Sequence, residues 1–120
     1  MAWEFNSREA IFLQMANRLR AEIICGRYAP DAQFPAVRQL AEEAAVNPNT
    51  VQKALASLEE EGLLYTKTTV GRFVTPDTAV IGAAKERMRR DAVRNFIAEA
   101  SQLGITKEEL ISYIKEEEEI

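Results

Sequence analysis

AAVNPNTVQKALASLEEEG, residues 44–62, is the stretch that decides the fold of this 120-residue chain. Asn47 and Pro48 predict the start of a helix, because asparagine is a good N-cap and proline fits the first helical position, where its missing N–H costs nothing. Gly62 is expected to end the helix. The apolar residues recur at helical spacing and predict one buried face, made of Val51, Ala54, Leu55 and Leu58.

The open face of the same helix carries side chains that are unusual for a solvated helix surface, where Glu and Lys are favoured. In isolation, Gln52 and Lys53 would be ordinary helix surface, and Asn47 would be a cap and nothing more. A function for this face therefore needs support from the rest of the chain. By elimination, the side chains that point outward are Asn49, Thr50, Gln52, Lys53 and Ser57.

The segments on either side complete the layout of a small helical domain. A first helix is predicted to begin at Asn6 or Ser7 and to end at Gly26, and a second, shorter helix is predicted to begin at Pro35. Two β-prone runs, LLYT and RFVT, flank residues 67–71 and predict a hairpin. Two short helices joined by a tight turn and followed by a hairpin are the arrangement of a winged helix-turn-helix.

Pro76 marks the predicted end of this domain, so residues 1–76 are assigned to the winged helix-turn-helix and residues 77–120 to a C-terminal helical dimerisation segment. The predicted fold class is mainly α with a small β-hairpin. The C-terminal segment should hold a long helix, about residues 80–103, and a last helix opened by a capping box at Thr106. These two helices cannot cover each other's apolar sides completely, so the winged domain or a second copy of the chain must cover the remainder. A two-fold homodimer is expected, with the interface residues Ile81, Ala84, Met88, Ala92, Phe96, Leu110 and Ile114.

Composition restricts the classes of function that are open to the chain. It contains no histidine and one cysteine, Cys25, so the commonest general base, a Cys–His nucleophile and a zinc site are unavailable. Enzymatic activity, a metal site and a cofactor are therefore not expected. The net charge is −4, and residues 116–119 are all glutamate, so a nucleic-acid site would have to be a local basic patch. No segment has the length and apolarity of a membrane helix or the pattern of a signal peptide, and a cytoplasmic location is expected.

A cluster of arginines within the predicted long helix allows two interpretations. We expect it to form a solvated face whose charges pair with Glu86, Asp91 and Glu99. Contact with DNA that flanks a binding site is the alternative. The cluster consists of Arg87, Arg89, Arg90 and Arg94.

Residues 34–74, FPAVRQLAEEAAVNPNTVQKALASLEEEGLLYTKTTVGRFV, resemble the DNA-binding domain of the GntR family of bacterial transcription regulators. The shared elements are P-x-V-R-x-L-A, N-x-N-T-V, A-L-x-x-L-E-x-E-G-L and the terminal G-x-F-V of the wing. The short two-helix part that follows is similar to the YtrA subfamily. Three departures stand out. Ala36 replaces a serine that caps the second helix in many members, and Thr69 replaces the first glycine of the usual wing G-x-G. Pro48 fits the YtrA type, but other branches of the family have an arginine there that contacts DNA.

The resemblance implies a homodimeric regulator, usually a repressor, that binds an operator with two-fold symmetry. In the YtrA subfamily the regulated genes often encode ABC-type transporters. The resemblance also implies where the DNA contacts lie: on the second helix, at the start of the recognition helix and on the wing. The positions that carry over are Arg38, Asn47, Asn49, Thr50, Gln52, Gly71 and Arg72.

This resemblance gives the open face of the central helix a chemical purpose. The first turns of a recognition helix lie in the major groove, where Asn and Gln can pair with adenine and Thr can reach phosphate or the thymine methyl group. Gln52 is therefore predicted to read a base and Lys53 to hold a phosphate. One alternative is a winged-helix module that binds a protein partner and no longer binds DNA, which the net acidity and Thr69 favour slightly. Another is a regulator gated by a small ligand between the C-terminal helices and the winged domain.

Overall fold

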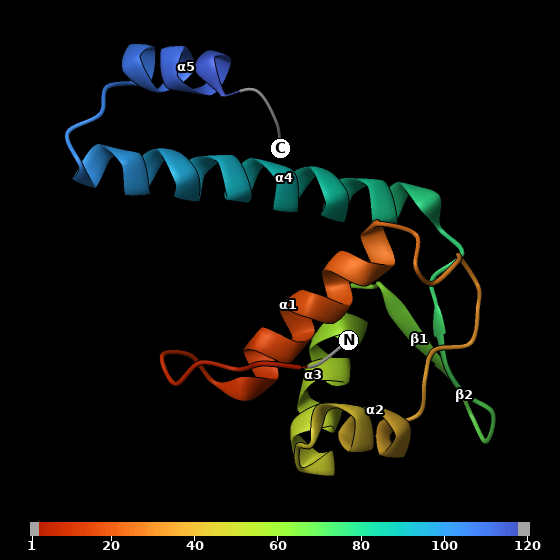
Figure 1. Cartoon of the computed structure of the whole chain (residues 1–120). Coiled ribbons are helices and arrows are strands. Elements are labelled where there is room, and N and C mark those ends of the chain that lie inside the picture. The colour runs from red at the N-terminus through yellow and green to blue at the C-terminus, as the bar shows by residue number, and fades with distance from the viewer. Residues whose placement is uncertain (1–2, 118–120) are drawn as a thin grey trace. The chain divides into compact units, whose positions relative to one another are not determined.

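The computed structural model of the chain describes residues 3–117 (Figure 1). The chain divides into two compact units, Met1–Lys85 and Glu86–Ile120, which are described separately below. The first unit is a winged helix-turn-helix and the second is helical. The elements are α1 (Ile11–Ile24), α2 (Val37–Ala44), α3 (Pro48–Glu60), β1 (Leu64–Lys67), β2 (Gly71–Val74), α4 (Thr78–Gln102) and α5 (Lys107–Glu116).

The core of the first unit is built around the packing of α1 against α3. Met15, Leu19 and Ile23 form the inner stripe of α1, and each is almost completely buried. Burying one such apolar side chain contributes roughly 1.5 to 3 kcal/mol. The predicted buried face of α3 is confirmed, because its four members, Val51, Ala54, Leu55 and Leu58, have no exposed surface.

The predicted start of α1 is wrong. The helix begins at Ile11, and its N-cap, Ala10, supplies no side-chain hydrogen bond. Asn6 lies in the preceding turn, where its side-chain oxygen accepts from the N–H of Arg8 (2.9 Å). The Gln14 amide holds that turn by donating to the backbone oxygens of Asn6 (3.0 Å) and Glu9 (2.7 Å). Asn6 therefore caps a local turn, and the helix starts one turn later.

The two helices of the helix-turn-helix differ in how they are capped. The N-cap of α2 is Ala36, which makes no side-chain hydrogen bond. A side-chain cap is therefore absent at this end of α2, as the replacement of serine by alanine predicts. The side-chain oxygen of Asn47 accepts from the N–H of Asn49 (2.7 Å) at the start of α3, and Pro48 takes the first helical position. Gly62 follows α3 with φ 81°, a left-handed conformation that glycine adopts without steric cost. Both ends of α3 therefore match the prediction.

The wing is an antiparallel hairpin in which Leu64 pairs with Val74 and Lys67 with Gly71. The other edge of β2 is also paired, because the N–H of Phe34 donates to the Arg72 oxygen (2.8 Å) and the N–H of Val74 to the Ala32 oxygen (2.9 Å). This second pairing ties the wing to the segment before α2.

At the base of the wing turn, the backbone at Gly71 lies close to the Gln33 side chain. Gly71 has φ 132°, and a Cβ atom added there would lie 3.1 Å from the Gln33 side-chain nitrogen. That nitrogen donates to the Val70 oxygen (3.0 Å) and so braces the turn. Thr69, at the tip, also has a left-handed backbone, with φ 67°. A β-branched residue is disfavoured there by roughly 1 to 2 kcal/mol, which is the cost of the departure from glycine.

The first unit extends beyond the predicted boundary at Pro76, to Lys85. The start of α4 packs on the winged core: Ala84 is completely buried in it, and Val80 and Ile81 are partly buried against it. These turns of α4 belong structurally to the winged helix-turn-helix.

The second unit contains the remainder of α4 and α5. The predicted capping box of α5 is confirmed: the Thr106 hydroxyl accepts from the Glu109 N–H (3.1 Å), and the Glu109 carboxylate accepts from the Thr106 N–H (2.9 Å). These bonds hold the pKa of the Glu109 carboxyl below its usual value. Ala100 and Leu110 are buried here. Within residues 3–117, no helix combines the length and apolarity needed to cross a membrane.

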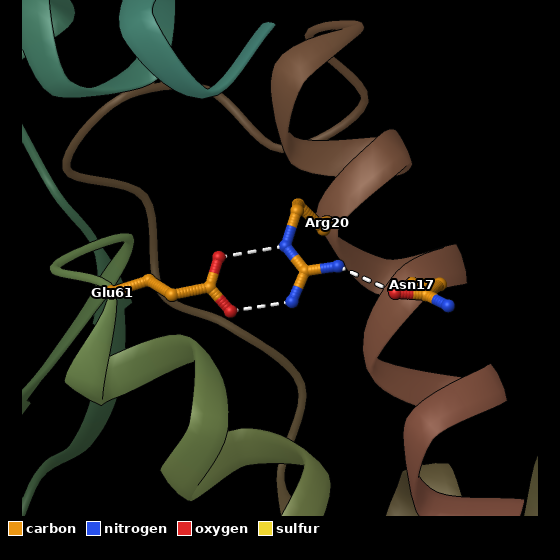
Figure 2. Close-up of polar contacts among 3 residues, drawn as sticks. All are labelled: Asn17, Arg20 and Glu61. Atoms are coloured by element: carbon orange, nitrogen blue, oxygen red, sulfur yellow. Dashed lines mark hydrogen bonds and ion pairs between the residues drawn. The ribbon is translucent and has the colours of Figure 1, made fainter. Parts of the chain in front are cut away.

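An ion pair fixes the C-terminal end of α3 to α1 (Figure 2). The Arg20 guanidinium makes two parallel contacts with the Glu61 carboxylate, one of them 2.7 Å long, and donates a third bond to Asn17 (2.7 Å). Both charged side chains are largely buried, with exposed fractions of 16% for Arg20 and 27% for Glu61. Bidentate charge-assisted bonds in such a site are stronger than exposed ion pairs.

We therefore expect Arg20→Gln to lower the free energy of unfolding by about 1 to 3 kcal/mol, because Glu61 loses its partner in a partly buried site. The matched control is Arg27→Gln, since Arg27 also pairs with a glutamate but is 56% exposed. The control should change stability by less than about 1 kcal/mol. Urea unfolding followed by circular dichroism measures both, and equal effects of the two variants would contradict a structural role for the Arg20 pair.

Candidate nucleic-acid interface

The outward side of α3 is the first part of the candidate interface. We define its reading face as Asn49, Thr50, Gln52 and Lys53, which are exposed except for the half-buried Thr50. Asn47 directly precedes them and is also exposed. Because the Asn47 oxygen already accepts from the Asn49 N–H, its amide NH₂ group is the part that can reach a ligand.

Arg38 lies on α2, beside the first turn of α3. Its side chain is exposed and borders a shallow hollow. The spacing to Glu42 would allow an ion pair along the helix, but none joins these two side chains in the part of the chain that the structure describes. The guanidinium is therefore available to a ligand next to the reading face. The hollow is lined by Val37, Arg38, Ala41, Glu42, Val46 and Pro48.

Lys53 and Gln52 lie at opposite edges of the reading face. The Lys53 nitrogen sits 5.4 Å from the centroid of the Phe12 ring on α1, so this side chain extends along the α1 edge. An exposed cation–π contact contributes only about 0.5 to 1 kcal/mol, so the ammonium can leave the ring for a phosphate. Gln52 instead faces the wing, as its contact with Arg72 shows.

A chain of polar contacts joins the reading face to the wing. The Arg72 guanidinium donates to the Gln52 side-chain oxygen (3.0 Å) and, through its Nε, to the Glu59 carboxylate (2.9 Å). The same carboxylate oxygen accepts from the Thr66 hydroxyl of β1. Two predicted contact residues, Gln52 and Arg72, are thus brought together by a glutamate on α3.

Three residues of this region were missed by sequence reasoning. Glu59 could have been found, because it lies seven residues after Gln52 and therefore on the same side of α3. Lys67 lies 4.5 Å above the Phe73 ring and adds a cation to the wing. The Tyr65 hydroxyl donates to the Asp31 carboxylate, which raises the pKa of Tyr65, since the bond requires the protonated phenol. Neither wing contact has a signal in the sequence beyond β-propensity.

The predicted dimer residues fall into two groups. Ala84 has no exposed surface within its own chain, which removes it from the candidate interface, and Ile81 is partly buried against the same core. Leu110 is also mostly buried. The remaining candidates are Met88, half-buried, and Ala92, Phe96 and Ile114, all exposed.

Two of the four arginines in the α4 cluster form ion pairs, so the first of the two interpretations is confirmed in part; Arg87, Arg89 and Glu99 form no ion pair within residues 3–117. Arg90 contacts Glu86 (3.0 Å) and Arg94 contacts Asp91 (3.6 Å), both along the helix surface. These side chains are exposed, so each pair contributes little to stability.

Comparison with known proteins identifies the family. Residues 12–74, which contain the reading face, Arg38 and the wing, match the model of the "Bacterial regulatory proteins, gntR family". The chain is 30% identical over 111 residues to the HTH-type transcriptional repressor YtrA of Bacillus subtilis (strain 168), covering 92% of this chain and 85% of that protein.

Two solved structures extend the comparison. A GntR family transcriptional regulator from Listeria monocytogenes has a TM-score of 0.87 and 35% identity, over 95% of this chain and 100% of that one. The DNA-binding domain of AraR, solved in complex with operator ORX1, has a TM-score of 0.55 and 26% identity, over 62% of this chain and 99% of that one. The protein therefore belongs to the GntR family and is a DNA-binding helix-turn-helix transcription regulator rather than an enzyme.

Proposed function

We propose that the chain is a sequence-specific repressor that binds a two-fold symmetric operator as a homodimer. The observation that carries this proposal is the reading face of α3, an exposed set of amide, hydroxyl and ammonium groups bordered by Arg38 and by the wing. Amides and hydroxyls at the start of a helix suit the base edges and phosphates of the major groove.

Each part of the surface has a distinct role in this proposal. The first turn of α3 enters the major groove, where its backbone N–H groups favour phosphate oxygens. Gln52 reads a base, while Arg38 and Lys53 hold phosphates on either side of the groove. The wing, with Gly71 at its turn, approaches the neighbouring backbone or minor groove, while Arg72 bridges the wing to α3. Phosphate contacts fix the register and the base contacts supply the specificity.

A regulator bound to an operator within a promoter would repress transcription, because it excludes the transcription machinery from that DNA. The relative YtrA is named a repressor, which supports this sign of regulation. The YtrA-like size and pattern of the C-terminal helices support a transporter operon as the target. A regulator of this kind would act in the cytoplasm, where chromosomal DNA is accessible.

The apolar side chains of the second unit support the dimer. Phe96 and Ile114 are each at least 50% exposed, and Val93 and Tyr113 are similarly exposed. Together with Ile105 and Leu110, several of them line an apolar hollow between α4 and α5. An exposed apolar patch of this kind marks an interaction surface, and a second copy of the chain would give two reading faces related by two-fold symmetry.

The alternative, a winged-helix module that binds only protein, predicts a different result in a gel-shift experiment. Specific, salt-sensitive retardation of the DNA upstream of the protein's own operon supports the regulator. The absence of any shift at low salt, with the protein folded, supports the protein-binding module.

We expect Arg38→Ala to leave the fold and the dimer intact and to flatten the slope of log affinity against log salt by about 2. Each phosphate contact contributes about 0.9 to that slope, and a dimer presents two copies of Arg38. Fluorescence anisotropy at several salt concentrations measures this. Arg38→Lys is the matched control, because it keeps the charge and should keep most of the slope. Unchanged operator affinity in Arg38→Ala at two salt concentrations would contradict the assignment.

Gln52→Ala and Lys53→Ala serve as controls for each other. Gln52→Ala should cost about 1 to 3 kcal/mol on the operator and relax the preference at one position of each half-site. Lys53→Ala should weaken binding to all sequences about equally, because a phosphate contact carries no sequence information. Selection from a randomised library separates the two effects. A Gln52→Ala protein with the wild-type preference at every position would refute the base-reading role.

Phe96→Glu is expected to convert the dimer into a monomer and to weaken operator binding, because it places a charge in the proposed interface. Ile114→Glu should do the same. Val70→Glu is the matched control, since Val70 is 55% exposed on the wing, outside the proposed interface, and Phe96 is 50% exposed. Light scattering coupled to size exclusion should give twice the 13.5 kDa chain mass for wild type and Val70→Glu. A Phe96→Glu, Ile114→Glu double variant that remains dimeric would place the interface elsewhere.

A further inference from the structure

Glu59 occupies a position that the proposed contacts leave unexplained. It projects from α3 toward the wing, where one of its carboxylate oxygens accepts from both the Arg72 Nε (2.9 Å) and the Thr66 hydroxyl. A carboxylate repels DNA phosphates, so Glu59 should weaken DNA binding at this place between two proposed contact elements. Its hydrogen bonds indicate a compensating role, which is to hold the Arg72 side chain in position.

The held Arg72 in turn fixes the orientation of the Gln52 amide. A guanidinium can only donate hydrogen bonds, so the end of the amide that faces it must be the oxygen. The Arg72 terminal nitrogen lies 3.0 Å from that oxygen. In a planar amide the oxygen and the nitrogen diverge from the same carbon, so the NH₂ group of Gln52 is turned away from Arg72. Gln52 is exposed, and its free end is therefore a hydrogen-bond donor.

This orientation changes which base Gln52 suits. A bidentate pair with adenine needs the amide oxygen to accept from N6 while the NH₂ group donates to N7. Guanine presents two acceptors, O6 and N7, along the same edge, and these match the free NH₂ group of Gln52. The Gln52 oxygen keeps a second lone pair, but the positive Arg72 guanidinium beside it disfavours the approach of another donor such as adenine N6. A glutamine on a recognition helix is usually expected to pair with adenine. The contact between Gln52 and Arg72 favours pairing with guanine instead.

We propose that Glu59 is a positioning residue that sets the base preference of Gln52 by holding Arg72 against the Gln52 oxygen. Guanine is then preferred over adenine at the base pair that Gln52 reads. This inference rests on the proposed function, because it requires that α3 reads operator DNA. Arg72 then contributes to base recognition through Gln52, because its guanidinium is hydrogen-bonded to two side chains of α3.

The test compares Glu59→Met with Glu60→Met. Methionine has a similar length and no oxygen that can accept from Arg72. Glu60 is the neighbouring exposed glutamate, and no ion pair or hydrogen bond of its side chain occurs in residues 3–117, so its variant makes the same change in charge. Arg72→Met is the second variant, because it removes the donor to Gln52 and leaves α3 unchanged. Circular dichroism and thermal unfolding verify that each variant is folded.

The readout is base preference, which a purely structural role of Glu59 would not move. Selection from a randomised library with wild type and Gln52→Ala first identifies the position that Gln52 reads. Affinities are then measured for operators that carry each of the four bases there. Wild type and Glu60→Met should prefer guanine over adenine by about fivefold or more. Glu59→Met and Arg72→Met should lose this preference or shift it toward adenine.

The possible failures are distinguishable. Wild-type protein that enriches no sequence overturns the proposed function and this inference with it. Specific binding in which wild type already prefers adenine at the Gln52 position, or in which Glu59→Met keeps the wild-type preference, overturns the role of Glu59 alone. An equal change of preference in Glu59→Met and Glu60→Met also overturns it, because the effect would then come from net charge.

Discussion

The burial of the apolar stripe of α3 against α1 fixes which side of α3 faces solvent. Val51, Leu55 and Leu58 have no exposed surface, and rotating the helix to bury its polar side instead would expose them and desolvate unpaired amides. The Arg20–Glu61 pair holds the far end of the same helix to α1. The reading face, the cap at Asn47 and the contact with the wing all take their positions from this packing.

The electrostatic design combines an acidic chain with a local cationic surface. Arg38, Lys53, Lys67 and Arg72 lie on α2, α3 and the wing, while a run of glutamates stands at residues 116–119. Glu59 lowers the positive charge between α3 and the wing by pairing with Arg72. In the proposed operator complex, a weak net attraction to phosphate would limit non-specific binding, and contacts with bases would supply a larger share of the affinity.

Much of this fold was predictable because short-range chemistry and long-range packing agree along residues 44–62. The cap, the proline and the apolar spacing all specify one helix in one orientation. The start of α1 was predicted wrongly because Asn6 can cap either a helix or a turn. Hydrogen bonds between the Asn6 backbone and the side chain of Gln14, eight residues away, stabilise the turn. Ala84 lies on the predicted apolar side of α4, but only the tertiary structure shows that the winged core covers it. The link from Gln52 through Arg72 to Glu59 depends on how the wing folds back on α3, which no local pattern specifies.

In the proposed complex, one reading face per chain binds one half of a symmetric operator. Selection of wild-type protein on a randomised duplex library, followed by footprinting of the enriched sequence, tests this arrangement. We expect two inverted copies of one short sequence, with centres about one helical turn or a small multiple of it apart, each protected together with its flanking phosphates. Enrichment of a single unpaired element, or protection with no preferred sequence, would contradict it.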